Sequence, residues 1–292
     1  MILKNNNLKI QIDFPKENYQ NSRFDWTGKI SEVVYKNNLL TANEKLLEQN
    51  DRIHGKGFYN EFGIDLPIGF NEIKEGEYFH KIGVGILKKE GESYLFNKNY
   101  EIAAAKFNVN ATSNIITIDC ESQSINGYSY HLKKEISLFE DSFKINYSLK
   151  NTGIKTISTD EYCHNFISIN KELIDSNYVL KFPFQLKSSL FDARVNPKKN
   201  VVIKTNKFTF KESTKNDFFF SNLSAGEQVN ATWELINKKT KVGLQEIGNF
   251  KTSKINLWGS KHVISPELFF KINVKPNDVL KWSRAYNFFE IN

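Results

Sequence analysis

The feature that most constrains the fold of this chain is the alternation of apolar and polar residues. Residues 143–150, 229–235 and 270–274 each carry apolar side chains at every second position. Because a β-strand sends alternate side chains to opposite faces, this period of two predicts half-buried antiparallel strands. Turn-forming residues lie near such segments, at Asn126-Gly127, Asn151-Thr152-Gly153 and Lys275-Pro276-Asn277-Asp278. Residues 42–49 are expected to form a short helix or a turn. We therefore predict an all-β protein, built as a large antiparallel β-sandwich.

Length and composition agree with a single large sandwich. The chain has 292 residues, with 24 Phe, 12 Tyr and 4 Trp but a single Met. Aromatic enrichment of this kind favours strands. Aromatic faces also suit stacking against sugars, although filling a core is their commoner role. The sequence contains no repeat of 20–50 residues, low-complexity tract or linker rich in Gly, Pro or Ser, so we expect one domain over residues 1–292.

The net charge of +7 requires a nucleic-acid partner to be considered. The lysines, however, are spread along the chain. Short runs such as Lys198-Lys199 and Lys238-Lys239 lie beside Asn and Thr, as at loop tips, and no recognition-helix pattern accompanies them. We expect a solvated, Lys- and Asn-rich surface and no nucleic-acid partner.

Cysteine usage and apolar runs limit the other classes. Cys120 and Cys163 form no CxxC motif, so neither a metal cluster nor a disulfide framework is indicated. The segment Met1–Asn5 opens no apolar run of signal-peptide length. No stretch approaches the roughly 20 apolar residues that span a bilayer. We expect a cytoplasmic protein with two free thiols and no membrane partner, and the oligomeric state stays open.

The best candidate for chemistry is His164, within the polar segment 160–166. If this segment is extended, Tyr162 and Phe166 share a face with His164, whereas Glu161 points the other way. Any carboxylate that works with His164 must then come from elsewhere in the chain. A core histidine with satisfied hydrogen bonds is the alternative.

Glu267 is a candidate for that carboxylate. It follows Pro266 at the head of a strongly apolar segment, where it is either an exposed strand start or a placed base. The glycine-containing segments 55–63 and 79–85 lack the spacing of phosphate or dinucleotide loops. Residues 23–28 are expected to hold a structural ion pair at a turn. The GxSxG, HExxH and DxDxDG motifs of serine hydrolases, zinc peptidases and EF-hands are absent.

Taken in order, several segments resemble the galactose mutarotase-like superfamily. They span almost the whole chain: Ser22-Arg23-Phe24-Asp25-Trp26-Thr27-Gly28, Gly57-Phe58-Tyr59-Asn60-Glu61-Phe62-Gly63-Ile64, Phe79-His80-Lys81-Ile82-Gly83-Val84-Gly85, Glu161-Tyr162-Cys163-His164-Asn165-Phe166, Ser265-Pro266-Glu267-Leu268-Phe269 and Trp282-Ser283-Arg284-Ala285-Tyr286-Asn287-Phe288. The resemblance implies a sandwich of two large curved antiparallel sheets, with a sugar site in a cleft on the concave side.

The resemblance also implies an activity, aldose 1-epimerisation. In true mutarotases a histidine protonates the ring oxygen of the sugar and a glutamate removes the proton of the anomeric hydroxyl. These roles match His164 and Glu267. Histidine titrates near neutral pH, and desolvation can raise the pKa of a carboxylate toward it. The chemistry needs no cofactor and no metal.

The resemblance assigns substrate contacts as well. The second histidine of the family matches His80, and Lys81, Asn60, Glu61 and Tyr162 are the other expected contacts with the sugar. An Arg–Asn–Arg segment that clamps sugar hydroxyls in the family is not found; the stretch around Asn60 and Glu61 takes its place. No aspartate after residue 200 is assigned to the substrate-orienting role that the family has in that region.

Three functions compete on this basis: an aldose 1-epimerase, a non-catalytic carbohydrate-binding protein, and an accessory of a lyase or hydrolase. An epimerase requires His164 and Glu267 to converge on one anomeric centre. Because a sugar carbon and its oxygens must fit between them, we expect a separation of about 5 Å or more.

Overall fold

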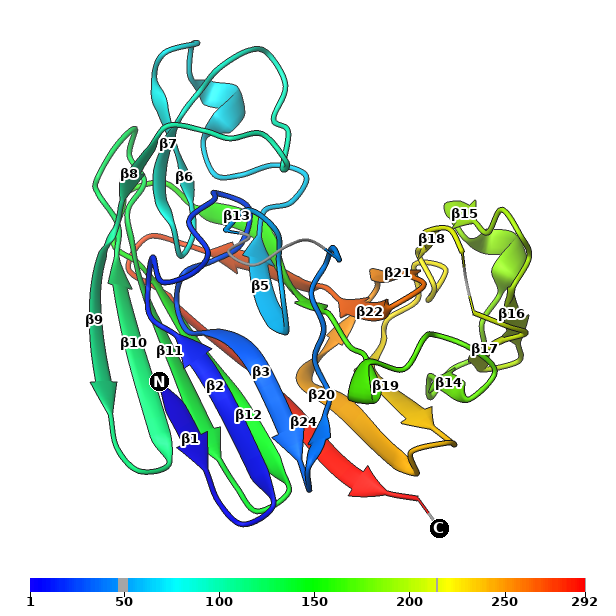
Figure 1. Cartoon of the computed structure of the whole chain (residues 1–292). Coiled ribbons are helices and arrows are strands. Elements are labelled where there is room, and N and C mark those ends of the chain that lie inside the picture. The colour runs from blue at the N-terminus through cyan, green and yellow to red at the C-terminus, as the bar shows by residue number, and fades with distance from the viewer. Residues whose placement is uncertain (47–51, 214, 292) are drawn as a thin grey trace.

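The computed structural model describes residues 1–46, 52–213 and 215–291, and most of their regular structure is strand. Two large antiparallel sheets lie face to face (Figure 1). The first contains, in spatial order, β1 (Ile2–Lys4), β2 (Leu8–Asp13), β3 (Lys29–Tyr35), β5 (Phe58–Phe62), β13 (Ile157–Asn165) and β23 (Phe270–Val274), with β4 (Asn38–Leu39) paired to β3.

The second large sheet has ten strands. In spatial order they are β16 (Val201–Lys204), β17 (Lys207–Phe210), β14 (Tyr178–Lys181), β19 (Val229–Asn237), β20 (Val242–Thr252), β24 (Val279–Glu290), β12 (Ser142–Asn151), β11 (Tyr130–Leu138), β10 (Ile115–Glu121) and β9 (Lys106–Ala111). Aromatic side chains from the two sheets stack between them, as Phe58 does on Tyr286 with ring centroids 4.7 Å apart.

Two smaller sheets project from this sandwich. One contains β6 (Tyr78–Lys81), β7 (Gly85–Lys88) and β8 (Ile102–Ala104). The other contains β15 (Ala193–Val195), β18 (Phe218–Ser221), β21 (Ile255–Ser260) and β22 (Val263–Leu268). Figure 1 places β6–β8 at the top and β15 and β18 at the right. The helices of the described residues are three single-turn 3₁₀ segments, η1 (Phe70–Glu72), η2 (Ile169–Lys171) and η3 (Ser188–Leu190).

The prediction of an all-β sandwich is confirmed, and the three period-two segments lie in β12, β19 and β23. In β12 the apolar residues are buried and the alternate ones are at least partly exposed, up to Lys150. Asn126 and Gly127 form the expected turn, both with positive φ. Residues 42–46 form no helix, and the rest of the segment 42–49 lies outside the described residues. The single-domain boundary stays a prediction.

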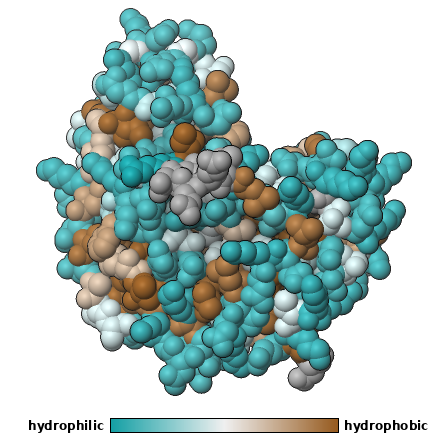
Figure 2. Space-filling view, viewed as in Figure 1, coloured by the Kyte–Doolittle hydropathy of each residue, from teal (hydrophilic) through white to brown (hydrophobic). Residues whose placement is uncertain are grey.

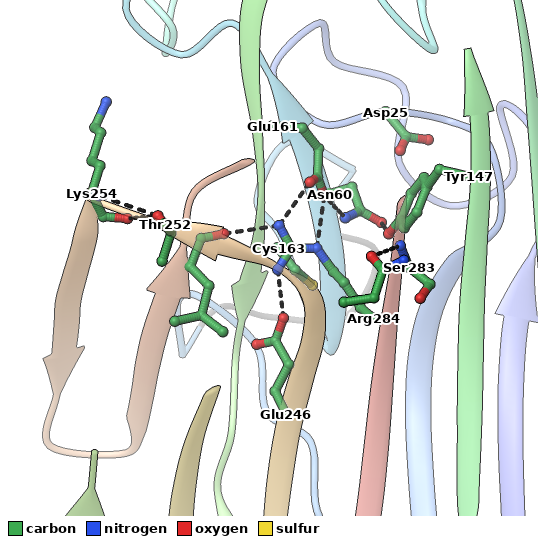
Figure 3. A network of polar contacts seen from close by, with 12 residues as sticks. Asp25, Asn60, Tyr147, Glu161, Cys163, Glu246, Thr252, Lys254, Ser283 and Arg284 are labelled. Atoms are coloured by element: carbon green, nitrogen blue, oxygen red, sulfur yellow. Dashed lines mark hydrogen bonds and ion pairs between the residues drawn. The ribbon is translucent and has the colours of Figure 1, made fainter. Parts of the chain in front are cut away.

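A fully buried polar network joins the two large sheets behind β13 (Figure 3). Arg284 of β24 forms ion pairs with Glu161 of β13 at 2.7 Å and with Glu246 of β20 at 2.6 Å. Asn60 of β5 donates to Glu161 at 2.6 Å and accepts from Lys134 of β11 at 2.6 Å. Buried charges are tolerated only when they are paired and hydrogen-bonded. The network therefore fixes which face of β13 points inward.

Both cysteines are buried and free, which confirms the prediction that they form no disulfide. Over the described residues, no helix has the length and apolar character that crossing a bilayer requires. The same residues contain no group of three or more His, Cys, Asp or Glu side chains arranged to hold a metal ion.

Candidate functional site

A cavity of about 690 Å³ opens beside the outward face of β13. Its lining comes from the loop between β7 and β8, from the small sheet of β18, β21 and β22, and from β13 itself. Figure 2 shows the surface notched between the projection of β6–β8 and the lobe that carries β15 and β18. Of the predicted site residues, Tyr162, His164 and Glu267 line this cavity.

The sequence folds locally so that His164 and Glu267 meet. An isolated antiparallel bridge joins Ile167, just after β13, to Ile264 of β22. Continued back along β13, this register places His164 opposite Glu267. Proline has no N–H to donate to a ladder. The carbonyl oxygen of Pro266 accepts a hydrogen bond from the side-chain amide of Asn165 at 2.7 Å, which ties β22 to β13 at this point. The Nε2 atom of His164 lies 3.4 Å from Oε1 of Glu267.

This distance corrects one expectation. The predicted separation of about 5 Å or more is wrong, because the two side chains lie side by side at 3.4 Å in the cavity wall. The two groups approach to ion-pair distance, while their hydrogen-bond partners are Ser265 for His164 and Asn256 for Glu267. Both residues nevertheless face the same cavity, so one ligand can contact both.

The ring of His164 is held on its other sides. Its Nδ1 atom lies 2.7 Å from the hydroxyl oxygen of Ser265. The imidazole stacks on Phe166, with centroids 4.0 Å apart, and meets the edge of Trp258 at 5.4 Å. Burial among these rings, together with the nearby charge of Arg23, holds the pKa of His164 well below its usual range. The imidazole is therefore neutral at pH 7.

The carboxyl group of Glu267 is perturbed in the opposite direction. Burial raises the pKa of Glu267 from 4.5 to about 8, although the charge of Arg23 and a hydrogen bond from Asn256 lower it in part. Asn256 lies directly opposite Glu267 on β21. Both shifts favour the uncharged form of the group, which is a carboxylic acid at Glu267 and a neutral imidazole with one N–H at His164. A donor and an acceptor of protons stand next to each other at the cavity surface.

Arg23 is a site residue that the sequence analysis missed, since residues 23–28 were interpreted as a structural ion pair. The ion pair is real: Arg23 bonds Glu44 at 2.9 Å and Glu61 at 3.0 Å. Yet Arg23 also lines the cavity, where its guanidinium packs between Phe24 and Phe96. A compositional signal existed. Only four residues of this lysine-rich chain are arginine, at positions 23, 52, 194 and 284, and two of these four, Arg23 and Arg284, form ion pairs with buried carboxylates.

Two aspartates of the cavity were also missed. Asp192 accepts a hydrogen bond from Asn222 at 3.0 Å, and Asp217 lies 4.0 Å from Lys45. Both line the wall that faces β13 from the β15–β18 lobe. Of the two, only Asp217 follows residue 200, the region in which the substrate-orienting aspartate of the family was sought. Neither has a sequence context that distinguishes it from other surface aspartates.

The remaining predicted substrate contacts lie below the cavity or away from it. Glu61 is fully buried and accepts hydrogen bonds from Tyr162 at 2.7 Å and from Lys81 at 3.3 Å. Lys81 also donates to Tyr94, and Asn60 belongs to the buried network behind β13. These three residues do not line the cavity. Tyr162 does, and its ring stacks on Phe269.

His80 lies farther from the site. Its ring is 1% exposed and packs edge-on against Tyr128 and Tyr130, and neither ring nitrogen has a hydrogen-bond partner within the described residues. Burial lowers the pKa of His80 to about 4. His80 is outside the lining of the cavity. A direct contact of His80 with substrate stays a prediction.

Comparison with solved structures places the fold. A galactose mutarotase-like protein from Lactobacillus casei ATCC 334 matches with a TM-score of 0.61 and 12% identity, over 99% of each chain. A galactose mutarotase related enzyme from Lactobacillus acidophilus matches with a TM-score of 0.57 and 11% identity, over 100% of this chain and 99% of that one. An aldose epimerase homologue from C. elegans matches with a TM-score of 0.58 and 10% identity, over 100% and 99%.

Models of known protein families and the curated proteins gave no match to this sequence. The structural likeness extends over the whole chain but at low identity, and therefore establishes the fold. The chain has the galactose mutarotase-like fold, as the order of its sequence segments indicated.

Proposed function

We propose that this protein is an aldose 1-epimerase, which interconverts the anomers of a reducing sugar by acid–base catalysis. The observation that supports the proposal most is the contact of His164 with Glu267 in the wall of a polar cavity. Titratable pairs whose environments push their pKa values away from the ordinary range are typical of catalytic sites. The solved structures of the same fold include one described as an aldose epimerase homologue.

The geometry suggests a sugar that lies against the pair rather than between its members. The ring oxygen and the anomeric hydroxyl are both bonded to C1, so two adjacent groups can each reach one of them. In the uncharged pair, the Glu267 carboxyl gives its proton to the ring oxygen while the His164 imidazole takes the proton of the anomeric hydroxyl. The C1–ring oxygen bond breaks and the aldehyde forms. Rotation about C1–C2 and the reverse transfers then close the other anomer.

These roles are the reverse of those that the family resemblance implied, where histidine is the acid and glutamate is the base. The reason is the direction of the two pKa shifts, which leaves the proton on the carboxyl group. The reaction is reversible, so each residue acts as acid in one direction and as base in the other. The transfers require neither a metal nor a cofactor.

Arg23 completes the proposed site as a donor to sugar hydroxyls, and Tyr162, whose only O–H is donated to Glu61, borders the site with its hydroxyl oxygen and its ring. Glu61 holds both: it accepts from the Arg23 Nε atom at 3.0 Å and from the Tyr162 hydroxyl at 2.7 Å. We assign Glu61 and Lys81 positioning roles below the cavity. With two free thiols, the protein suits a reducing compartment, and we place it in the cytoplasm acting on free sugars.

The test is the rate at which a purified sugar anomer equilibrates, followed by polarimetry or NMR over a panel of aldoses. We expect His164→Ala and Glu267→Ala each to lose at least about 10²-fold of the catalysed rate. The double variant should lose much less than the product, because the two residues act as a unit. If the wild type binds sugars without accelerating equilibration, the protein is a carbohydrate-binding protein on the same fold.

A further inference from the structure

A second cavity adjoins the proposed catalytic one. It has a volume of about 420 Å³, and four residues line both cavities: Asp65, Ser253, Lys254 and Phe269. The second cavity continues along the outer face of β13 and β23 and the end of β20. The two therefore form one groove that leads away from His164 and Glu267.

Lys254 and Asp65, which line both cavities, form an ion pair where the cavities adjoin. The Nζ atom of Lys254 bonds Asp65 at 2.8 Å and Asp160 at 3.4 Å, and it lies over the Phe269 ring. The side chains of Lys254 and Asp65 are 40% and 76% exposed. An ion pair as exposed as that between Lys254 and Asp65 contributes little to stability, so these side chains can move aside at small cost. In Figure 3, Lys254 projects away from the buried network.

The second cavity is lined by groups that bond sugar hydroxyls. Ser158 supplies a hydroxyl group and Gln228 an amide group, and Lys251 and Lys271 supply donors. Neither of these lysines forms an ion pair with any described residue. A few placed polar groups around partly apolar walls are typical of ligand sites. The groove therefore offers polar side chains beyond the cavity that holds His164 and Glu267.

We propose that the natural ligand is a reducing glycan of at least two sugar residues. Its reducing-end ring occupies the cavity at His164 and Glu267, and the next residue passes Lys254 into the second cavity. This inference rests on the proposed sugar site, yet it concerns the length of the ligand and holds for a binder as well as for an enzyme.

Isothermal titration and saturation-transfer NMR with matched ligands test it. The probes are glucose against maltose, cellobiose and lactose, all three of which present a glucose ring at their reducing end. We expect at least one disaccharide to bind about tenfold more tightly than its monosaccharide. Disaccharides that bind no more tightly than monosaccharides, or a panel in which nothing binds, would overturn the inference.

A blocking variant locates the effect. Ser158 is exposed on β13 and lines only the second cavity, so Ser158→Trp should fill that cavity without touching the first. Disaccharide affinity should fall to the monosaccharide level, while monosaccharide affinity stays unchanged. Ser113→Trp, on the exposed turn between β9 and β10, is the matched control. An equal loss for both ligand lengths would refute the second subsite.

The proposed catalysis and the proposed second subsite can each be refuted without the other. Anomer equilibration of monosaccharides in wild type, His164→Ala and Glu267→Ala reports on the catalytic proposal alone. The ratio of disaccharide to monosaccharide affinity, measured in the same variants, reports on ligand length alone. A protein that binds disaccharides more tightly but accelerates no equilibration keeps the second subsite and loses the epimerase.

Discussion

The hydroxyl oxygen of Ser265 lies 2.7 Å from Nδ1 of His164, on the side of the ring away from Glu267. Ser265 is fully buried and does not line the cavity. Its hydrogen bond fixes the ring plane and decides which nitrogen is presented to Glu267 and to a ligand. Ser265 is therefore a positioning residue of the proposed catalytic pair.

Removing that hydrogen bond should slow catalysis without weakening binding. We expect Ser265→Ala to lower kcat about tenfold while KM stays near that of the wild type, because a misoriented imidazole still borders the same cavity. Steady-state anomerisation kinetics give both constants. Ser265→Thr keeps a hydroxyl and should recover much of kcat. A parallel change of KM in Ser265→Ala would assign the residue to binding instead.

The rate of anomerisation should fall as the pH rises through about 8. Below that value Glu267 keeps its proton and the pair contains one acid and one base; above it the acid is lost. The measurement is kcat from pH 6 to pH 9.5. A rate that stays level across pH 8 would contradict the assignment of the proton to Glu267.

Ionisation of Glu267 should also lower the free energy of unfolding at alkaline pH. Its pKa is higher in the folded protein, about 8, than the ordinary 4.5, so the folded state binds the proton more tightly. Stability is therefore lost progressively as the pH rises from 4.5 to 8. We expect Glu267→Gln to remove this loss and to be more stable than the wild type by about 1 to 3 kcal/mol at pH 8.5.

Urea unfolding at pH 5 and pH 8.5 measures the difference. Glu92→Gln, at an exposed position, is the control and should leave the pH dependence unchanged. If Glu267→Gln is no more stable than the wild type at pH 8.5, the carboxyl group is not destabilised by burial.

Arg23 should not be replaceable by lysine. Its fork bonds Glu44 and Glu61 at once while its plane packs between Phe24 and Phe96. An ammonium group has neither the planar shape nor the fixed donors. We expect Arg23→Lys to fold but to weaken sugar affinity about tenfold. Titration calorimetry measures the affinity, and Lys45→Arg, at the more exposed rim, is the comparison. Unchanged affinity in Arg23→Lys would exclude Arg23 from the sugar site.

The buried network behind β13 should lose more stability when Arg284 alone is replaced than when the two carboxylates that it pairs with are neutralised as well. Arg284→Met leaves Glu161 and Glu246 buried without their cation, which typically costs about 3–5 kcal/mol. Adding Glu161→Gln and Glu246→Gln removes the uncompensated charges and should restore part of that stability. Denaturant unfolding checks both. A triple variant that is less stable than Arg284→Met would show that the carboxylates contribute by other means.

Much of the fold and part of the candidate site follow from local sequence. The alternation in residues 143–150 depends only on strand geometry and the burial of one face, and β12 follows it. The same rule separated Tyr162 and His164 from Glu161, and the structure places the first two at the cavity and the third in the buried network. It also required a remote carboxylate for His164.

The sequence by itself determined the strands at residues 143–150, 229–235 and 270–274, the turn at Asn126-Gly127 and the division of β13 into two faces, because these depend on neighbouring residues along one strand. Only the tertiary structure decided that His164 and Glu267 touch, that Arg23 borders the cavity and that His80 does not. The first two facts depend on how β22 and the segment around Arg23 pack against β13, and the third depends on the place of β6 in the small projecting sheet. Burial then decided which member of the pair holds the proton, since desolvation is a property of the assembled core and not of any segment.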